Sequence, residues 1–243
     1  MKHRWTTLWA LALPLWLVGC SSAPPVAEWR VHTHSASERA TEAYLSGHTR
    51  VADSDWARAV HQAARSALPE QVARVRLRQC AAQVASLVFT PCPGLGLLQS
   101  DMGPELQAYQ HYLSTPWQPG DVALQPLLPP SQLPAVRLLG AGAAGTPEAQ
   151  AAAAAAQLSA LQGMADPLSR LVGAAVLLRA GQLSPPTAAL AVETASAQGW
   201  VRPLLAWLGV QAQWAELAGD LDTARRARRR MDLLAPAPSD APR

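Results

Sequence analysis

AGQLS at residues 180–184 recurs as AGDLD at residues 218–222, 38 positions later, and this pair of segments decides the fold. In each segment a glycine, which commonly ends a helix, precedes a serine or aspartate that can cap the next helix. The chain is rich in alanine and leucine, which favour helix, and poor in residues that favour strands. The sequence therefore predicts an all-α fold, with an array of helical hairpins over residues 147–235.

The order helix, Ala-Gly-x-Leu-cap, helix resembles the hairpins of tetratricopeptide-type (TPR-like) repeats. Tyr44-Leu45-Ser46-Gly47 is a third segment that resembles this turn, but more weakly. The resemblance is partial, because the 38-residue spacing exceeds the family period of about 34 residues. The family's aromatic residue in the first helix is also not repeated. The resemblance implies an α-hairpin array whose surface binds protein or peptide.

A second helical unit is predicted over residues 35–114, starting at a capping box formed by Ser35 and Glu38. Residues 20–34 have no periodic apolar face and are predicted to be a flexible tether. Residues 236–243 are expected to form a disordered tail. Within the N-terminal unit we expect helices over residues 36–46, 53–67, 69–90 and 104–114.

A segment rich in proline and glycine separates the two helical parts. Residues 115–146 hold six prolines and four glycines, a density that excludes a long helix. We therefore expect an irregular linker or flap that divides the chain. If the flap covers a cleft, that cleft is where an enzyme active site is expected.

Cys80 and Cys92 form the cysteine pair in the body of the chain. A bridge between them requires the chain to double back sharply after the helix that carries Cys80, and Pro91 and Pro93 suit such a turn. The alternative is a metal-binding or redox pair. The spacing fits neither a zinc pattern nor Cys-x-x-Cys, so a structural disulfide is favoured.

The N-terminus carries a secretory pattern. Lys2 and Arg4 precede an uncharged run of 13 residues, Thr6 to Val18, which is shorter than the ~20 apolar residues of a membrane span. Leu17-Val18-Gly19-Cys20 resembles the lipobox of bacterial lipoproteins, in which the cysteine is lipidated and becomes the new N-terminus. The resemblance implies a signal peptide over residues 1–19 and a covalent lipid, with acyl chains such as palmitate, on Cys20. The alternative is an ordinary signal cut elsewhere, with Cys20 a plain cysteine.

The expected location and the net charge of the chain limit the kinds of partner that it can bind. Ser21 after the lipidated cysteine resembles lipoproteins sorted to the periplasmic face of the outer membrane; the alternative is the periplasmic face of the inner membrane. Removal of residues 1–19 takes away Lys2 and Arg4 and lowers the net charge from +3 to about +1. We therefore expect a membrane partner through the lipid anchor and another envelope protein, and no nucleic acid.

Three tryptophans fall on one face of the helix expected over residues 201–218. Trp200, Trp207 and Trp214 are spaced by seven residues and form a stripe with Leu204 and Leu217. Tryptophan is enriched at binding hot spots, so the stripe is a candidate partner surface. The favoured alternative is that this face packs in the core.

A cluster of arginines is the most concentrated charge in the chain after removal of the signal. Together with Arg202, it is expected to form a positive patch for lipid headgroups, anionic glycan or an acidic partner. The alternative is a solvated helix face. The cluster consists of Arg225, Arg226, Arg228, Arg229 and Arg230.

No catalytic or metal-binding motif is recognisable in the sequence. His32 and His34 lack a third ligand nearby, no nucleophile elbow or glycine-rich phosphate loop is present, and no cofactor is predicted besides the covalent lipid. The leading hypothesis is a non-enzymatic, lipid-anchored protein–protein adaptor of the cell envelope. The alternatives are an envelope enzyme acting on glycan or peptide, and a purely structural, self-associating lipoprotein.

Overall fold

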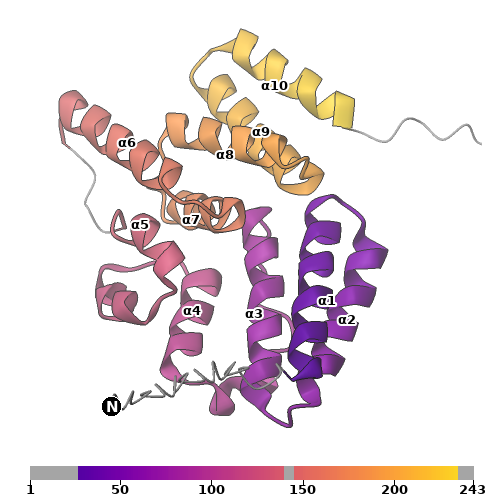
Figure 1. Ribbon diagram of the computed structural model, residues 1–243. Coiled ribbons are helices and arrows are strands. Elements are labelled where there is room, and N and C mark those ends of the chain that lie inside the picture. The colour runs from indigo at the N-terminus through magenta and orange to yellow at the C-terminus, as the bar shows by residue number, and fades with distance from the viewer. Residues whose placement is uncertain (1–26, 140–144, 235–243) are drawn as a thin grey trace, which may run out of the picture.

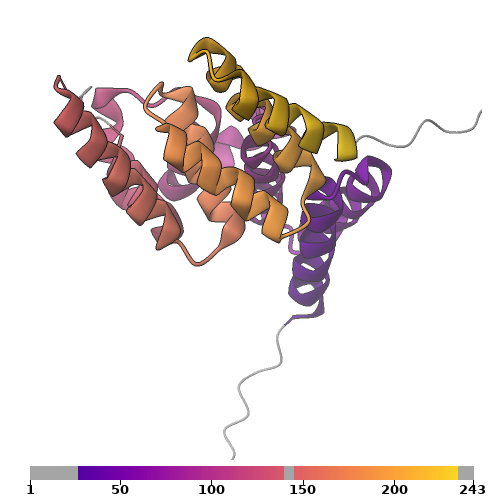
Figure 2. The ribbon, with the colours of Figure 1, turned by 90° about the horizontal axis from the view of Figure 1, so that it is seen from above.

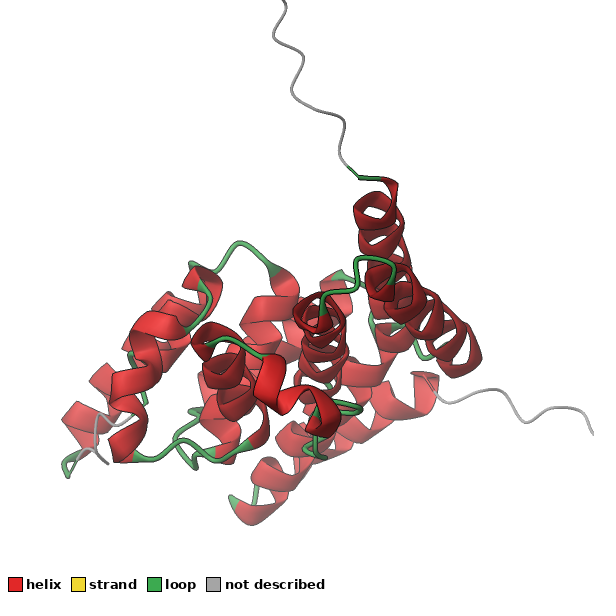
Figure 3. Ribbon diagram, turned by 90° about the horizontal axis from the view of Figure 1, so that it is seen from below, coloured by secondary structure: helices red, strands yellow, loops and turns green. Residues whose placement is uncertain are grey.

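The computed structural model describes residues 27–139 and 145–234, and within them every regular element is helical (Figures 1 and 3). The predicted all-α fold is therefore confirmed. No helix of the described residues is both long and apolar enough to span a membrane. The lipobox, including Cys20, and the tail at residues 236–243 lie outside the described residues. The α-helices are α1 Glu28–Leu45, α2 Thr49–Ala64, α3 Pro69–Ala85, α4 Pro104–Ser114, α5 Leu133–Val136, α6 Pro147–Gln162, α7 Pro167–Arg179, α8 Pro185–Ala197, α9 Val201–Leu217 and α10 Leu221–Leu234.

The first helix begins earlier than the sequence predicted. α1 starts at Glu28, so the part of the expected tether between residues 28 and 34 is helical, and the capping box at Ser35 does not start a helix. Glu28 in the first turn suits the positive end of the helix dipole. Ser37 and Thr41 donate to the carbonyls of Thr33 and Ser37 at 2.8 Å, so these hydroxyls are satisfied inside the helix rather than at its start.

The described part of the 115–146 segment contributes to the core, which corrects its prediction as a linker that divides the chain. It contains the 3₁₀ helices η2 (Pro119–Leu127) and η3 (Pro130–Gln132) and the short α5, and residues 140–144 lie outside the described part. A proline occupies the first position of η2 and of η3, where a missing N–H removes no helical bond. Proline density therefore excluded a long helix but permitted short ones. Its buried side chains include Trp117, Leu128, Gln132, Ala135, Val136 and Leu139.

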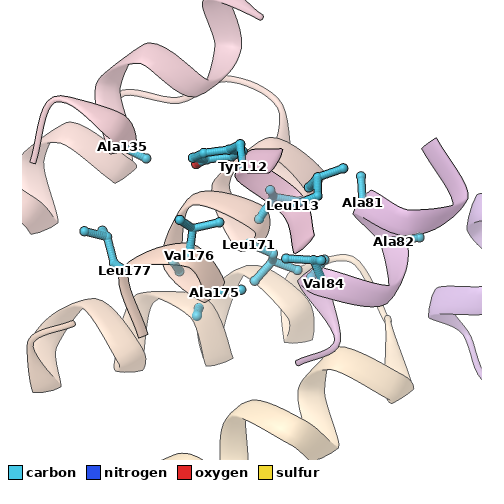
Figure 4. Packing of buried hydrophobic residues seen from close by; sticks show 14 of the residues in the cluster. Ala81, Ala82, Val84, Tyr112, Leu113, Ala135, Leu171, Ala175, Val176 and Leu177 are labelled. Atoms are coloured by element: carbon cyan, nitrogen blue, oxygen red, sulfur yellow. The ribbon is translucent and has the colours of Figure 1, made fainter. Parts of the chain in front are cut away.

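One hydrophobic cluster joins the two helical parts and has α7 at its centre. α7 contacts α3 and α4 of the N-terminal part, α5, and α6 and α8 of the C-terminal part. Figure 4 shows Val84 of α3 and Leu113 of α4 close to Leu171 and Val176 of α7, with Ala135 of α5 nearby. A second, smaller cluster fills the space between α1 and α2. The expected N-terminal and C-terminal units thus share a core.

The two repeated segments form the same turn. Gly181 and Gly219 adopt positive φ angles of 69° and 77°, which glycine tolerates better than other residues. The N–H of Gln182 donates to Leu177 O at 2.9 Å, and that of Asp220 donates to Ala215 O at 2.8 Å, as in a Schellman motif. These turns join α7 to α8 and α9 to α10. In the view from above, α6, α8 and α10 lie in that order across the molecule (Figure 2). The hairpin form is thus present, while the tetratricopeptide resemblance stays a prediction.

Cys80 and Cys92 form a disulfide, as predicted, with their Cα atoms 5.1 Å apart. The chain reverses at the end of α3, where Leu87 has a φ of 60° and Val88 N donates to Gln83 O at 2.9 Å. This is the same helix-ending motif as at the glycine turns, with leucine in the left-handed position. The reversal carries Cys92 back to α3 and closes the bridge.

Three arginines cap the carbonyl ends of helices other than their own. Arg179 donates to the carbonyls of Tyr112, Leu113 and Thr115 at 2.7–2.8 Å and so ends α4. Arg170 donates to three carbonyls just before and after the end of α6, including Met164 O at 2.6 Å. Arg202 donates to Tyr44 O at 2.9 Å at the end of α1. Each guanidinium satisfies carbonyls that have no partner within their own helix.

A pair of glycine substitutions tests the packing of α5 on α7. A Cβ atom at Gly173 would lie 2.7 Å from Ala135 Cβ, so Gly173→Ala should destabilise the fold by about 1–3 kcal/mol through overpacking. Gly209, inside α9, has no atom within 4 Å of the corresponding position, so Gly209→Ala should stabilise the fold by about 0.5–1 kcal/mol. Urea unfolding of both variants measures the difference. Equal stability of the two variants would show that the 115–146 segment does not lie against α7.

Candidate binding groove

A groove of about 830 Å³ lies between α3, α4, α7 and residues 126–132. Its floor is apolar and includes Leu77, Leu106, Leu128 and Val172. Prolines 126, 129 and 130 line one wall, so the segment that the sequence predicted as a flap covers this side of the groove. The volume is within the range of about 300–1,000 Å³ that is typical of pockets for small ligands.

Two arginines of α3 form the cationic side of the groove. Arg74 and Arg78 are one helical turn apart and both line it. Arg74 pairs with Glu70 in its own helix at 2.5 Å. Arg78 pairs with Glu38 of α1 at 2.6 Å and donates through Nε to Thr41 Oγ1 at 3.1 Å. Both charges thus have partners within the protein, although the pairs are exposed enough to exchange with a ligand.

Tyr109 and Asp166 also line the groove, together with Arg78. Asp166 accepts from Ser169 N at 2.8 Å and caps α7, so its position is fixed by the start of that helix. Burial raises the pKa of Tyr109, the Asp166 carboxylate raises it further, and Arg78 lowers it. The phenol is therefore a neutral hydrogen-bonding group at physiological pH.

A buried hydrogen-bond chain holds the walls of the groove in place. Tyr112 of α4 donates its hydroxyl proton to Gln132 Oε1 at 3.0 Å, and Gln132 Nε2 donates to Ser169 O of α7 at 3.3 Å. Gln132 is almost completely buried, so loss of either bond would leave an unsatisfied amide in the core. α4, the proline-rich wall and α7 are therefore fixed relative to one another.

The groove continues towards α1. A neighbouring hollow of about 740 Å³ shares Arg78, Asp166 and Leu168 with it and is also lined by Glu38 and Glu42 of α1. Arg78 and Asp166 therefore lie where the two hollows meet. Together the two hollows form a trough across α1, α3 and α7.

The structure places two of the three predicted tryptophans in the core. Trp200 and Trp207 are 7% and 0% exposed, and their indole N–H groups donate to Glu42 Oε2 at 2.9 Å and Ala85 O at 3.1 Å. The core interpretation is thus confirmed for these two residues, and they offer no partner surface. Trp214 is half-buried, and Leu217 is 79% exposed and leaves the stripe.

The arginine cluster is exposed on α10, but Arg202 does not act as a free charge beside it. Arg202 stacks on the ring of Tyr44 at 4.4 Å and donates to Tyr44 O and to Thr49 Oγ1. Its guanidinium thus joins α9 to the turn between α1 and α2. The prediction of a patch that included Arg202 is wrong, because its guanidinium is bound to Tyr44 and Thr49. The local sequence gives no sign of these partners.

Sequence reasoning placed a possible cleft under the 115–146 segment but did not identify the other residues that line the groove, although parts of it could be inferred. The spacing of Arg74 and Arg78 places both on one face of a helix, and Asp166-Pro167 marks a helix start. Nothing local shows that α4 and residues 126–132 complete the site. Within the described residues, no group of three His, Cys, Asp or Glu side chains is placed to hold a metal ion. His32 and His34 lie on α1 beside Glu28 and Glu38.

No protein-family model, curated protein or solved structure matches this chain. A functional inference therefore rests on the residues and geometry described above.

The tyrosines around the groove predict a pH dependence. Burial raises the pKa of Tyr44, Tyr109 and Tyr112, the three tyrosines of the chain, above the ordinary value of 10.0. Stability should be unaffected by these groups below pH 10.0 and should fall above it, because the unfolded chain then ionises while the folded chain does not. Phenolate absorbance in native and urea-unfolded protein should show much less ionisation in the native protein at pH 10.0. Matching titration curves would contradict the burial of these phenols.

Proposed function

We propose that this chain is a lipid-anchored protein of the bacterial cell envelope that acts as an adaptor. In this proposal Cys20 carries the lipid, and the helical body binds an extended segment of a partner protein in the groove. The outer membrane, on its periplasmic face, is the proposed location.

The anchor is supported by the residues before and after the cleavage position. Leu17, Val18, Gly19 and Cys20 fit the lipobox in order, and Lys2 and Arg4 supply the positive start. Each buried methylene contributes about 0.8 kcal/mol, so two or more acyl chains on one cysteine hold a protein stably at a membrane. The disulfide between Cys80 and Cys92 fits an exported protein, since disulfides persist in oxidising compartments.

The shape and chemistry of the groove carry the adaptor part of the proposal. It is an open trough with an apolar floor, and its two arginines are already paired: Arg74 with Glu70, and Arg78 with Glu38. Charges held in this way suit recognition of a polar backbone and side chains better than proton transfer. The length of the trough, including its extension to α1, suits an extended segment more than a compact metabolite.

An envelope enzyme is the second candidate, because the cleft that it requires lies beneath the 115–146 segment. Tyr109, Arg78 and Asp166 meet in that cleft. Two observations favour binding over catalysis: Asp166 is engaged as the cap of α7, and burial raises the pKa of Tyr109, so this phenol stays protonated at neutral pH. An Asp166→Asn variant that abolishes a measurable glycan or peptide hydrolysis would favour the enzyme.

The anchor is tested by lipid labelling in cells. Cells grown with an alkyne-tagged palmitate should incorporate the tag into the wild-type chain, because Cys20 would carry a thioether-linked diacylglycerol and an acylated amine. Cys20→Ser should abolish labelling and leave the chain uncleaved, whereas Ser21→Ala should label normally. Labelling of the Cys20→Ser variant, or none of the wild type, would contradict the anchor.

The groove is tested by site-specific photocrosslinking in intact cells. A benzophenone amino acid at Leu127, which lines the groove, should crosslink to one protein at a defined peptide segment. The matched control is Val122 in the same 3₁₀ helix, which is exposed and does not line the groove. Val122 should give less than about a tenth of the Leu127 crosslink if the partner occupies the groove. Equal crosslinking at both positions would show that the groove is not the binding site.

A further inference from the structure

The outward face of α10 is exposed in the described fold. α10 packs chiefly on α9, and its inner face is formed by Ala224 and Ala227, which are buried, with Met231 and Leu234 partly buried beside them. The opposite face, which carries most of the arginines, is exposed along the whole helix. In Figure 1 this helix forms one end of the molecule, on the far side of α9 from the rest of the fold.

The arginines of α10 fall into two groups. Arg225 pairs with Asp222 at 2.5 Å, and Arg228 pairs with Glu216 of α9, so these two charges are used locally. Arg229 and Arg230 form no ion pair or hydrogen bond with any residue that the structure describes, and Arg226 donates only to Thr223 Oγ1. Two arginine charges on this face are thus available to a partner.

An apolar residue lies among the available arginines. Leu233 is 85% exposed, and it lines a shallow hollow of about 540 Å³ with Arg226, Arg229, Arg230 and Asp232. Exposed leucines of this kind are common singly and need no partner on their own. Here the leucine and the arginines share one hollow, which combines an apolar contact with donors that bind carboxylates bidentately.

We propose that the outward face of α10 docks an acidic segment of a partner protein, with Arg229 and Arg230 binding its carboxylates and Leu233 contacting an apolar side chain between them. Charge complementarity supports this occupant. α10 carries five arginines and two aspartates, and one of those aspartates is neutralised by Arg225. Arginine beside apolar residues is also the composition that is enriched at protein interfaces.

If Cys20 carries the proposed lipid anchor, the position of α10 argues against the anchoring bilayer as the partner of this helix. α1 has 18 residues and is about 27 Å long. It begins at the end of the molecule opposite α10 (Figure 1). The eight steps from Cys20 to Glu28 reach at most about 29 Å when fully extended. A tether stretched along α1 would end level with the far end of that helix, and the outward face of α10 lies beyond it.

The test compares two double variants that remove the same charge from the same helix. The full chain in non-ionic detergent is titrated with a fluorescein-labelled peptide of alternating glutamate and leucine, and binding is followed by anisotropy. R229Q/R230Q should weaken binding by at least about tenfold, because it removes the unpaired guanidinium groups. R225Q/R228Q should weaken it less than about threefold, because those arginines are held by Asp222 and Glu216. Circular dichroism should be the same for all three proteins.

Three results would overturn the docking proposal. They are no binding of the acidic peptide by the wild type, equal weakening by the two double variants, and loss of peptide binding when the chain is placed in nanodiscs that contain phosphatidylglycerol rather than phosphatidylcholine alone. The last result would assign the face to lipid headgroups. Failure of palmitate labelling would refute the anchor but would leave the detergent titration valid, so the two failures are distinguishable.

Discussion

The structure depends on Arg179. Its guanidinium lies at the C-terminal end of α7 and donates to three carbonyls at the end of α4. The guanidinium also lies over the ring of Phe89, with Cζ 5.1 Å from the ring centroid. Burial lowers the pKa of Arg179, so the charge is held where hydration is reduced. The carbonyls offset this, because a buried charge is tolerated where hydrogen bonds replace water. This contact fixes the C-terminal helices to the N-terminal ones.

The groove is a consequence of that attachment. Once α7 is held against α4, Ser169 lies where Gln132 can bond it, and Gln132 in turn receives the hydroxyl of Tyr112. The proline-rich segment is then clamped between the helices and lines one side of the groove, instead of linking two separate domains. α3 supplies the opposite wall, and the disulfide between Cys80 and Cys92 ties it to the segment that follows it. The Arg179 contact, the Gln132 hydrogen bonds and the packing of α7 on α3 thus hold the site together.

The features that could be predicted from the sequence are those set by local chemistry. Gly181 and Gly219 end helices because their backbone conformation is local, and Cys80 and Cys92 are close enough in the chain for the turn between them to be deduced. Predictions failed where a distant group decided the outcome. The prolines of the 115–146 segment start short helices, and side chains beside these helices, such as Trp117 and Leu128, are buried in the core. The groove is formed by four segments that are distant in sequence, so the proline-rich segment indicated a possible cleft but no local pattern revealed its other walls.

The arginines show why charge density alone does not identify a binding surface. Arg170, Arg179 and Arg202 appear in the sequence as isolated cations, yet each is committed to carbonyls of another helix. The five arginines of α10 appear as one patch, yet Arg225 and Arg228 are paired within the hairpin. Free charge is what remains after these internal contacts are satisfied, and in α10 it is concentrated at Arg229 and Arg230 beside Leu233. A partner would therefore recognise the end of the helix rather than the whole cluster.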